Sequence, residues 1–600
     1  MKYLSSLQNK NNFIFWLAFL GGNLVLFAPM YILTAQGSAF FPSLHSWAAL
    51  QARENYDLWR LGLEWVLLFA VWVAFPRLWT VRGRRAFRWA AFALLLVFLI
   101  YQIYEAVDVA LYHNTPNFYN DWAFLGGGIG FVLDSLTLPW WAYPAGVVGL
   151  IVAVWLIYQI ATTPFTRVVP NRLHPLTRGG VLVLAAAALA FTVAFPAEAA
   201  TPEGEVASLS LKLAANIRQA RLTQERVQAM QQVSPYKVYD YRRYTLAEHP
   251  NVYLFFLESY GSVLINDPVF HSRYEALMDE VQQELSAAGW HMASGLSRSP
   301  VWGGGSWMAY TSALCGVRIA QQPQYLTLKY SFQNTPYPNL GRYMQSQGYR
   351  FTWVVPIDRE LSAYLWKTNR RFYGPDVWLT FSDLNYHGPE YSWGPSPPDQ
   401  YTLGFLRAWL AKQPPKPNFV FFLTQNTHYP FAPVPPIVKD WRELNDPNID
   451  HPDARPKPRA VEAYMEAVTY DWQVLADFIR TAGKNDVFIL VGDHQPPAVS
   501  GPWDGYETIM HVIARDPAFV ESFTTYGLVP GMLPDPHAAP LHHEGLYSLL
   551  VRQLVARWGT NPNDLPAYHP QGIRIPGILP KVRSIYHKAQ KFKPHATEQP

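Results

Sequence analysis

The chain has 600 residues, half of them hydrophobic, and its 48 Lys and Arg against 44 Asp and Glu leave a net charge of +4. This length exceeds what one hydrophobic core supports, the small charge excess does not indicate nucleic-acid binding, and the single cysteine, Cys315, excludes an internal disulfide. A mean hydropathy close to zero, despite so many apolar residues, suits a chain that is part membrane protein and part soluble domain.

Five apolar stretches before residue 200 each approach the ~20 residues that a helix needs to cross a bilayer. They are, approximately, Phe13–Leu33, Leu61–Leu78, Phe87–Ile103, Tyr143–Ala161 and Gly180–Phe195. The sequence therefore predicts a transmembrane domain with five helices over residues 1–200. Glu64, near the start of the second stretch, is interpreted either as solvated among lipid headgroups or as part of a headgroup or substrate site.

The positions of arginines predict how these helices are oriented. The segment 77–88 after the second stretch carries five arginines and the segment 167–178 after the fourth carries three, whereas 105–122 has no Lys or Arg. Because positive loops stay in the cytoplasm, the second and fourth connections are predicted to be cytoplasmic. The chain is then a multi-pass protein of the cell (inner or plasma) membrane, with everything after residue 200 outside the cytoplasm. Arg53 and Arg60, after the first stretch, are a minor exception.

A change of pattern near residue 200 predicts a second, soluble part. Residues 201–249 have a helical pattern with many charges and are predicted to form a connecting or interfacial helix. Residues 250–578 are predicted to form an α/β domain whose mostly parallel sheet is covered by helices on both faces. Its apolar runs of strand length are 252–257, 350–355, 418–424, 486–491 and 509–514, and its helical patterns include 274–288, 340–347 and 461–482. Residues 579–600 are predicted to be a loose basic tail.

Polar residues follow three of the predicted strands. Glu258 and Ser259 follow the first, "QNTHYPF" with His428 follows the strand at 418–424, and Asp493 with His494 follows the strand at 486–491. Ligands of such sheets bind outside the carboxyl ends of the strands. The three strand ends therefore predict one common site.

Four motifs in this order resemble the alkaline-phosphatase superfamily, in the membrane-anchored, sulfatase-like branch of lipoteichoic acid synthases and phosphoglycerol transferases. They are "NVYLFFLESYG", "GGGSWMAYTSALCG", "NTHYPF" and "VGDHQPP". The resemblance implies five membrane helices followed by an extracytoplasmic sulfatase-like domain, which covers nearly the whole chain.

The resemblance also assigns roles to individual residues. Ser306 matches the nucleophile, where the family usually has threonine, and Glu258, Asp493 and His494 match metal ligands, with the Ser306 hydroxyl as a fourth. His428 matches a substrate-contacting histidine, and Trp366 with Arg370 loosely matches a Trp/Arg substrate pair. Other interpretations stay open: Thr311 or Ser299 as the nucleophile, His428 as a packing residue, and His511, His542 and His543 as a second metal site.

The chemistry of these residue types supports the assignment independently. Two carboxylates, an imidazole and a hydroxyl form a ligand set for one divalent metal, Mn²⁺ or Zn²⁺, with Mg²⁺ as a further option. A metal lowers the pKa of a hydroxyl that it binds, so that the hydroxyl can attack phosphorus or sulfur. The sequences "SWMAY" and "CGVRI" do not fit the C/S-x-P-x-R motif of formylglycine sulfatases, and a single cysteine is unlike the disulfide-containing phosphoethanolamine transferases.

The predicted function is therefore that of a metal-dependent transferase or hydrolase of phosphoester bonds. The specific prediction is transfer of phosphoglycerol from a membrane phospholipid, the donor, to a cell-envelope glycan or polymer, the acceptor, through a covalent Ser306 intermediate. No nucleic-acid partner is expected, and the sequence indicates no oligomeric state. The alternatives are a sulfuric-ester or other phosphoester hydrolase of the same superfamily, and a non-catalytic membrane receptor or scaffold built on a degenerate phosphatase-like domain.

The predicted orientation can be tested by proteolysis of intact cells. Because the segments 77–88 and 167–178 are expected inside, external protease should release a fragment that begins within residues 200–250, and mass spectrometry of its N-terminus identifies the cleavage site. Cleavage within 77–88 while the C-terminal part is protected would mean that the orientation is reversed.

Overall fold

The computed structural model describes residues 2–34, 60–76, 80–112, 115–124, 141–202, 204–332, 334–356, 363–391, 396–449, 460–501 and 504–574. The chain divides into two compact units, residues 1–222 and 223–600, and the division falls inside helix α9 (Leu209–Gln231) of the predicted connector. The predicted tail 579–600 lies outside the described residues.

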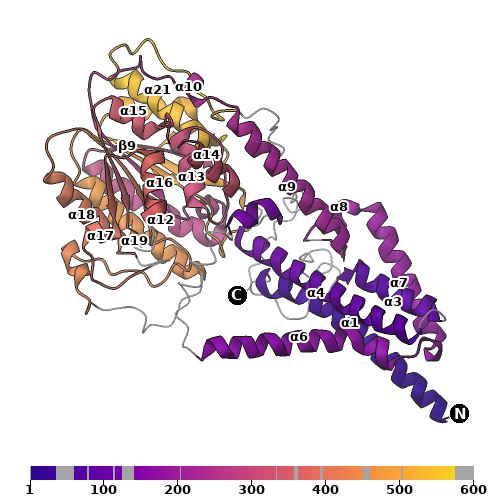
Figure 1. Ribbon diagram of the computed structural model, residues 1–600. Coiled ribbons are helices and arrows are strands. Elements are labelled where there is room, and N and C mark those ends of the chain that lie inside the picture. Colours follow the sequence, from indigo (N-terminus) through magenta and orange to yellow (C-terminus); the bar gives the residue numbers. More distant parts are fainter. Residues whose placement is uncertain are drawn as a thin grey trace. The chain divides into compact units, whose positions relative to one another are not determined.

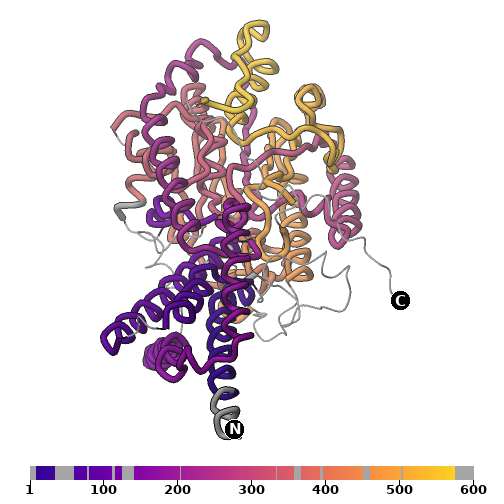
Figure 2. The backbone as a smooth tube through the Cα atoms, turned by 90° about the vertical axis from the view of Figure 1, so that its right-hand side faces the viewer, coloured from indigo at the N-terminus to yellow at the C-terminus, as the bar shows by residue number. Residues whose placement is uncertain are grey.

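The N-terminal unit is built mainly of helices. α1 packs against α4 and α6, and α3 packs against α7. Figure 2 shows the helices of this unit in indigo and purple. The main helices are α1 (Lys2–Thr34), α3 (Leu63–Ala74), α4 (Val81–Tyr112), α6 (Ala142–Arg167) and α7 (Pro175–Ala194), followed by the short α8 (Pro196–Ala199).

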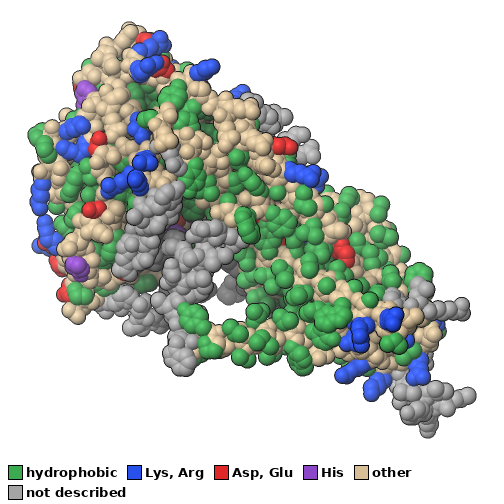
Figure 3. Space-filling model, viewed as in Figure 1, with side chains coloured by type: hydrophobic (Ala, Val, Ile, Leu, Met, Phe, Trp, Pro, Cys, Tyr) green, Lys and Arg blue, Asp and Glu red, His purple; other side chains and the backbone are tan. Residues whose placement is uncertain are grey.

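Four segments within these helices are long and apolar enough to cross a membrane: Asn9–Leu33, Val81–Ala110, Ala142–Arg167 and Pro175–Ala194. The second predicted span is instead the 12-residue helix α3, which is shorter than the ~20 residues that a straight crossing needs. Much of the first half of α6 exposes apolar side chains, and Figure 3 shows this helix covered with hydrophobic atoms. Such a surface is unfavourable in water and is suited to lipid.

Polar contacts hold the start of α9 within the N-terminal unit. The Glu64 carboxylate accepts hydrogen bonds from the backbone N–H groups of Leu209 and Ser210 and from two serine hydroxyls, so it caps the helix. One turn further on, Lys212 Nζ lies 2.5 Å from Glu105 Oε2, and both side chains are buried. Glu64 therefore neither points into solvent nor stands alone; it fixes the first turn of α9.

The C-terminal unit contains a sheet of nine strands among its described residues, in the order β10-β4-β9-β8-β3-β7-β5-β6, with β11 beside β4 (Figure 1). The five strands β8, β3, β7, β5 and β6 run parallel, whereas β9 is antiparallel to both β8 and β4, so the predicted mostly parallel sheet is confirmed. The strands are β3 (Asn251–Leu257), β4 (His291–Arg298), β5 (Arg350–Val355), β6 (Val377–Thr380), β7 (Asn418–Leu423), β8 (Asp486–Gly492), β9 (Glu507–Ala514), β10 (Val529–Pro530) and β11 (Leu541–His542).

Helices cover both faces of this sheet, as predicted. The helices of eight or more residues are α12 (Pro268–Ala287), α13 (Ser306–Cys315), α14 (Gln322–Ser331), α16 (Ala363–Tyr373), α18 (Asp399–Ala411), α19 (Ala460–Arg480) and α21 (Leu546–Trp558). The shorter ones are α10 (Pro235–Val238), α11 (Val263–Asn266), α15 (Leu340–Ser346), α17 (Phe381–Leu384) and α20 (Pro517–Glu521).

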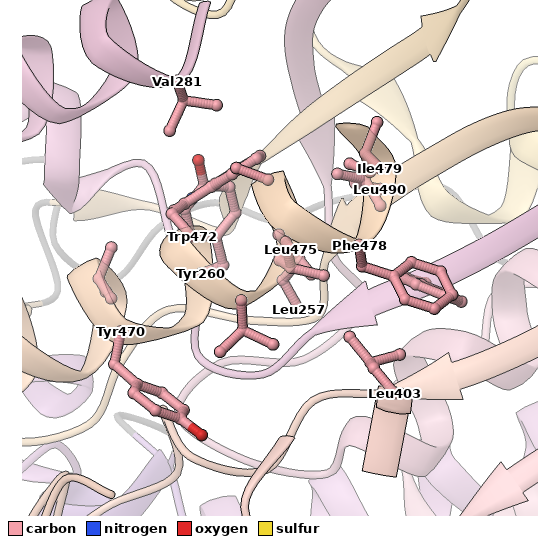
Figure 4. Packing of buried hydrophobic residues seen from close by; sticks show 14 of the residues in the cluster. Leu257, Tyr260, Val281, Leu403, Tyr470, Trp472, Leu475, Phe478, Ile479 and Leu490 are labelled. Atoms are coloured by element: carbon pink, nitrogen blue, oxygen red, sulfur yellow. The ribbon is translucent and has the colours of Figure 1, made fainter. Parts of the chain in front are cut away.

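The alternation of side chains along β3 explains why the run is almost entirely apolar. Tyr253, Phe255 and Leu257 belong to the core cluster formed with α12, α18 and α19, part of which is shown in Figure 4. On the opposite face, Val252 lies beside residues of α15 and α21. A strand with both faces buried has no position for a polar side chain until it ends.

Four strands of this sheet, β4, β6, β10 and β11, were not predicted. β4 has the sequence "HMASGLSR", which lacks an apolar run, and its position is determined by full antiparallel pairing with β9. A Cβ atom added at Gly295, within β4, would lie 2.9 Å from Leu528 Cγ, so glycine at this position lets Leu528 pack closely against the strand. The local sequence therefore did not predict β4, which forms a strand because it pairs with the distant β9.

Two histidines proposed for a second metal site are instead hydrogen-bonded within the core. His511 Nδ1 is 2.7 Å from Ser294 Oγ and its Nε2 is 3.0 Å from Tyr260 Oη, while His543 bonds to Ser297 Oγ and to the carbonyl of Gly492. Burial lowers the pKa of His511 to about 3 and that of His543 to about 4. With both ring nitrogens of each residue engaged, neither is available as a metal ligand.

These buried histidines predict how stability depends on pH. A histidine whose pKa is lowered on folding contributes stability that is complete above its unfolded pKa of ~6.5 and is lost as the pH falls. We expect the full-length protein in detergent to lose about 2 kcal/mol of unfolding free energy per buried histidine between pH 6.5 and pH 5, visible as a falling Tm by tryptophan fluorescence. His511→Gln should make this slope shallower, whereas His249→Gln, at an exposed position, should not; equal slopes in all three proteins would contradict the assignment.

Candidate active site

The register of β3 and β8 places two acidic residues side by side. Leu257 pairs with Gly492, so the residues that follow them, Glu258 and Asp493, leave the sheet at the same level. The Asp493 N–H donates to the carbonyl of Leu257 at 3.1 Å, and the Glu258 N–H donates to Thr424 Oγ1 at 3.0 Å. Both carboxyl groups are buried, with exposed fractions of 2% for Glu258 and 0% for Asp493.

One oxygen of Asp493 is held by the backbone and the other faces the site. Oδ1 accepts hydrogen bonds from the N–H of Ser259 at 2.7 Å and from the N–H of His494 at 2.6 Å. Ser259 has a φ of 55°, a left-handed conformation that is uncommon for a non-glycine residue and that occurs where the chain turns toward Asp493. Oδ2 is buried and has no hydrogen-bond donor among the described residues. An orphaned carboxylate oxygen in such a place is suited to a cation.

The imidazole of His494 is oriented by its own loop. Its Nδ1 lies 2.9 Å from the carbonyl of Gln495, which can only accept, so Nδ1 carries the hydrogen and Nε2 presents its lone pair to the site. Nε2 is 3.3 Å from Asp493 Oδ2 and 3.5 Å from Glu258 Oε1. This arrangement, with a backbone acceptor behind the ring, is typical of a histidine that binds a metal.

Ser306 reaches the same cluster from a helix terminus. It is the first residue of α13, and its Oγ donates to Glu258 Oε2 at 2.9 Å and lies 3.3 Å from His494 Nε2. The preceding Gly305 has a φ of 83°, a conformation that side-chain-bearing residues rarely adopt, and an added Cβ there would lie 2.7 Å from Met308 Cε. The N-terminal end of α13 also favours negative charge at Ser306.

The two buried carboxyl groups of the cluster favour a bound cation. Burial, reinforced by the charge of Glu258, raises the pKa of Asp493 to about 8. Burial also raises the pKa of Glu258 and lowers that of His494. One atom each of Glu258, Asp493 and His494 lie within 4.8 Å of one another, the one such group in the described part of the chain that could hold a metal ion. The oxygen and imidazole ligands fit a divalent metal, whose charge would offset the cost of burying the two carboxylates.

The alternative nucleophiles lie outside this cluster. Thr311 Oγ1 donates to the carbonyl of Trp307 and lies 2.6 Å from Tyr373 Oη, and Ser299 Oγ accepts a hydrogen bond from Val301 N. Among the described residues, neither hydroxyl forms a hydrogen bond with Glu258, Asp493 or His494. Ser259 Oγ also donates to Glu258, at 3.0 Å to Oε1, but among the described residues it is Ser306 Oγ that contacts both Glu258 and His494.

The three predicted substrate residues differ in their positions. His428 lies close enough to Asp493 and His494 to interact electrostatically with both, and its Nδ1 bonds to the carbonyl of Tyr429 at 2.7 Å. Trp366 packs edge-to-face against Trp378 at 5.2 Å, and Arg370 is exposed on the same helix, α16. No hydrogen bond, ion pair or ring contact within the described ranges joins Trp366 or Arg370 to the cluster, so their substrate role stays a prediction.

Sequence reasoning missed the residues that hold the ligands in place. Thr424 accepts the Glu258 N–H, and Tyr464 of α19 donates to the carbonyl of Ser259 at 2.7 Å. Thr424 follows the end of β7 directly, and this strand-end position was a signal that could have indicated it. Tyr464 lies within an amphipathic helix, where nothing distinguishes it from other core aromatics.

Comparison with known proteins supports this geometry. Residues 280–522 match the model of the Sulfatase family. The match includes Ser306, Asp493 and His494, whereas Glu258 lies before it. It confirms the predicted resemblance and the prediction of an enzyme, and enzymes with the sulfatase fold generally bind a divalent metal. No curated protein matches the sequence.

Several solved structures are weakly similar to this chain. The lipoteichoic acid synthase LtaP of Listeria monocytogenes has 14% identity and a TM-score of 0.37, covering 57% of this chain and 81% of its own. The Streptococcus pyogenes phosphoglycerol transferase GacH, in complex with sn-glycerol-1-phosphate, has 13% identity and a TM-score of 0.34, covering 55% of this chain and 82% of its own. The periplasmic domain of the phosphoethanolamine transferase EptC of Campylobacter jejuni has 11% identity and a TM-score of 0.31, covering 51% and 91%. Scores this low support no inference about function.

The cluster predicts one bound divalent metal per chain. Elemental analysis of the purified full-length protein should find close to one Mn or Zn, and the double variant Asp493→Ala, His494→Ala should lose it because two of the three buried ligands are removed. Adding metal to the metal-free wild type should raise its Tm by mass action, with no such rise in the double variant. Asp486→Asn, a buried acid at the opposite end of β8, is the matched control and should keep its metal. Full metal content in the double variant would rule out the site.

Proposed function

We propose that the chain is a membrane-anchored, metal-dependent phosphotransferase that moves phosphoglycerol from a phospholipid headgroup to a cell-envelope glycan or polymer. The observation that carries the proposal is the position of Ser306 Oγ, 2.9 Å from Glu258 Oε2 and 3.3 Å from His494 Nε2, at the start of α13. The sulfatase-family match supports a reaction at a tetrahedral phosphate or sulfate ester. The choice of phosphoglycerol rests on the sequence motifs.

The proposed reaction has two halves, each a displacement at phosphorus. In the first, Ser306 Oγ forms a bond to phosphorus as the bond between phosphorus and the diacylglycerol oxygen breaks. The proton leaves Ser306 along its hydrogen bond to Glu258 Oε2, and the departing diacylglycerol oxygen takes up a proton. In the second half, a hydroxyl of the acceptor attacks phosphorus, Ser306 is released and it regains its proton.

Glu258, Asp493, His494 and the Ser306 hydroxyl would hold the metal, which when bound lowers the pKa of the hydroxyl and stabilises charge on the phosphoryl oxygens. The N-terminal end of α13 adds to the same effect, because the helix dipole favours the negative charge that develops at Ser306. His428 is proposed to contact the phosphoryl group or the entering hydroxyl. Trp366 and Arg370 are proposed as further substrate contacts.

The membrane unit would keep the enzyme beside its phospholipid donor. Four apolar helices long enough to cross a bilayer precede the catalytic unit, so the enzyme stays where phospholipid headgroups are. Diacylglycerol, the product of the first half, is apolar and remains in the same membrane. With the orientation expected from the arginines, the catalytic unit lies outside the cytoplasm, where the envelope polymer is found.

A sulfuric-ester hydrolase is the second candidate, and the family match favours it specifically. An alkoxide at Ser306 could attack sulfur as well as phosphorus. The two candidates are separated by comparing turnover of labelled phosphatidylglycerol, followed as release of diacylglycerol, with turnover of an aryl sulfate. Hydrolysis of the aryl sulfate without any release of diacylglycerol would replace the phosphotransferase by a sulfatase.

The role of Ser306 makes the sharpest prediction. Ser306→Ala should lower turnover by at least about 10³-fold while the metal content and the Tm change little, because only the attacking hydroxyl is removed. Ser306→Thr should keep substantial activity, since threonine supplies the same group. Mass spectrometry of trapped enzyme should find a glycerophosphoryl or phosphoryl adduct on the peptide that contains Ser306. An adduct on Thr311, or wild-type turnover by Ser306→Ala, would overturn the assignment.

A further inference from the structure

Two buried acids lie beneath the loop that carries His428. Asp399 is the first residue of α18 and Asp471 lies in the middle of α19, with exposed fractions of 1% and 4%. No Lys, Arg or His pairs with either one in the described part of the chain. Acids buried without a cationic partner are costly, so their contacts need an explanation.

Nearly all the contacts of Asp399 are made with residues 425 and 426. Its carboxylate accepts hydrogen bonds from the backbone N–H of Gln425, at 2.8 Å to Oδ2, and from that of Asn426 at 2.9 Å. In return, the N–H of Asp399 donates to Asn426 Oδ1 at 2.7 Å. The same carboxylate thus fixes two successive peptide groups of one turn.

Asp471 holds the next residue of that turn. Its Oδ2 accepts a hydrogen bond from Thr427 Oγ1 at 3.2 Å. The turn is closed by the His428 N–H, which donates to the carbonyl of Gln425 at 3.1 Å. The two acids together therefore contact residues 425, 426 and 427, which directly precede His428.

Burial raises the pKa of both carboxyl groups, and because two neighbouring buried charges repel each other, a proton on one of the two is favoured. Asp399 accepts two backbone N–H groups and is therefore the ionised partner. Asp471 Oδ1 is buried and receives no hydrogen bond from a described donor, so it is suited to carry the proton. Burial and the neighbouring charge of Asp399 both raise the pKa of Asp471 well above its usual value.

We propose that Asp399 and Asp471 are positioning residues: a carboxylate and a protonated carboxyl that together hold residues 425–427 so that His428 faces the reacting phosphoryl group. The role given to His428 rests on the proposed function, whereas the hydrogen bonds from Asp399 and Asp471 to residues 425–427 do not depend on it. The pair binds neither metal nor substrate; it acts through His428, which lies within electrostatic reach of Asp493 and His494. Sharing one proton lets a single negative charge be buried where two would repel.

Activity of the full-length enzyme on labelled phosphatidylglycerol tests the coupling to His428. Asp399→Asn should lower kcat about tenfold or more, because a neutral amide oxygen accepts the two backbone N–H groups more weakly than a carboxylate does, and the amide NH2 would replace an oxygen that faces the Gln425 N–H, while KM and metal content stay near wild type. When the same change is made in a His428→Ala background, it should cause no further loss. A full additional loss there would show that Asp399 acts through the general fold and would overturn the proposal.

Asp471 is tested by a rescue pair. Asp471→Ala should lose activity, whereas Asp471→Asn should recover most of it, because the amide N–H can donate to Asp399 and the amide oxygen can accept from Thr427. Thr427→Val removes one hydrogen bond with little change in shape and should lower kcat by roughly threefold. This variant keeps the test decisive if Asp399→Asn does not fold. Equal activities of Asp471→Ala and Asp471→Asn, or wild-type kcat in Thr427→Val, would contradict the proposed pair.

Hydrogen exchange separates this inference from the proposed function, because it needs no substrate. Exchange of the amides in the peptide 424–431 should become at least about tenfold faster in Asp399→Asn, since the Gln425 and Asn426 N–H groups exchange a charged carboxylate for a weaker, neutral acceptor. Asp486→Asn, a buried acid that accepts from Asn251 and Gly483 instead, should leave this peptide unchanged. If the wild type releases no diacylglycerol, the proposed function fails, and the exchange result alone decides whether the pair holds the turn. Unchanged exchange in Asp399→Asn would overturn the inference.

Discussion

Two carboxylates that lie side by side in a buried site are the constraint on which the rest of the structure depends. Glu258 and Asp493 leave adjacent parallel strands at the same level, and burial together with the charge of Glu258 raises the cost of ionising Asp493. Such a pair is stable in the folded protein only if a proton or a cation is held between its members. Every neighbour of the pair, from His494 Nε2 to the Ser306 hydroxyl, contributes a group suited to the same positive centre.

Hydrogen bonds that involve backbone N–H groups fix the positions of the two acids in this site. Asp493 is held by the N–H groups of Ser259 and His494, and Glu258 is anchored through its own N–H to Thr424. These contacts come from three parallel strands, β3, β8 and β7, so the spacing of the strands sets the spacing of the ligands. A ligand set built on the ends of buried strands is harder to displace than one built on loops alone. This explains why the strands are apolar to their last residue and polar immediately after it.

The sequence allowed prediction of those parts that depend on local pattern. Five strands, the helices on both faces and the strand-end residues Glu258, Asp493 and His494 follow from apolar runs that stop abruptly at polar residues, whereas Ser306 was assigned through the resemblance of its motif to a known family. β4 escaped prediction because "HMASGLSR" becomes a strand only by pairing with β9, more than two hundred residues later. α3 was expected to span a membrane because its composition is apolar, although its helix stops after 12 residues. Glu64 was interpreted either as solvated among headgroups or as part of a headgroup or substrate site, and its capping of α9 depends on a contact across 145 positions.

The burial of Asp399 and Asp471 could not be predicted from the sequence. Each acid lies in a helix, where an isolated Asp resembles any solvated residue, and only the fold shows that both are buried under one turn. The catalytic unit thus contains two pairs of neighbouring acids, and they solve the same electrostatic problem differently. Glu258 and Asp493 lie beside the Ser306 hydroxyl and His494 Nε2 and so are suited to a cation, whereas Asp399 and Asp471 accept hydrogen bonds from residues 425, 426 and 427 of one turn. In the proposed enzyme the first pair holds the metal and the second supports the turn before His428, so the two pairs do not compete for the metal.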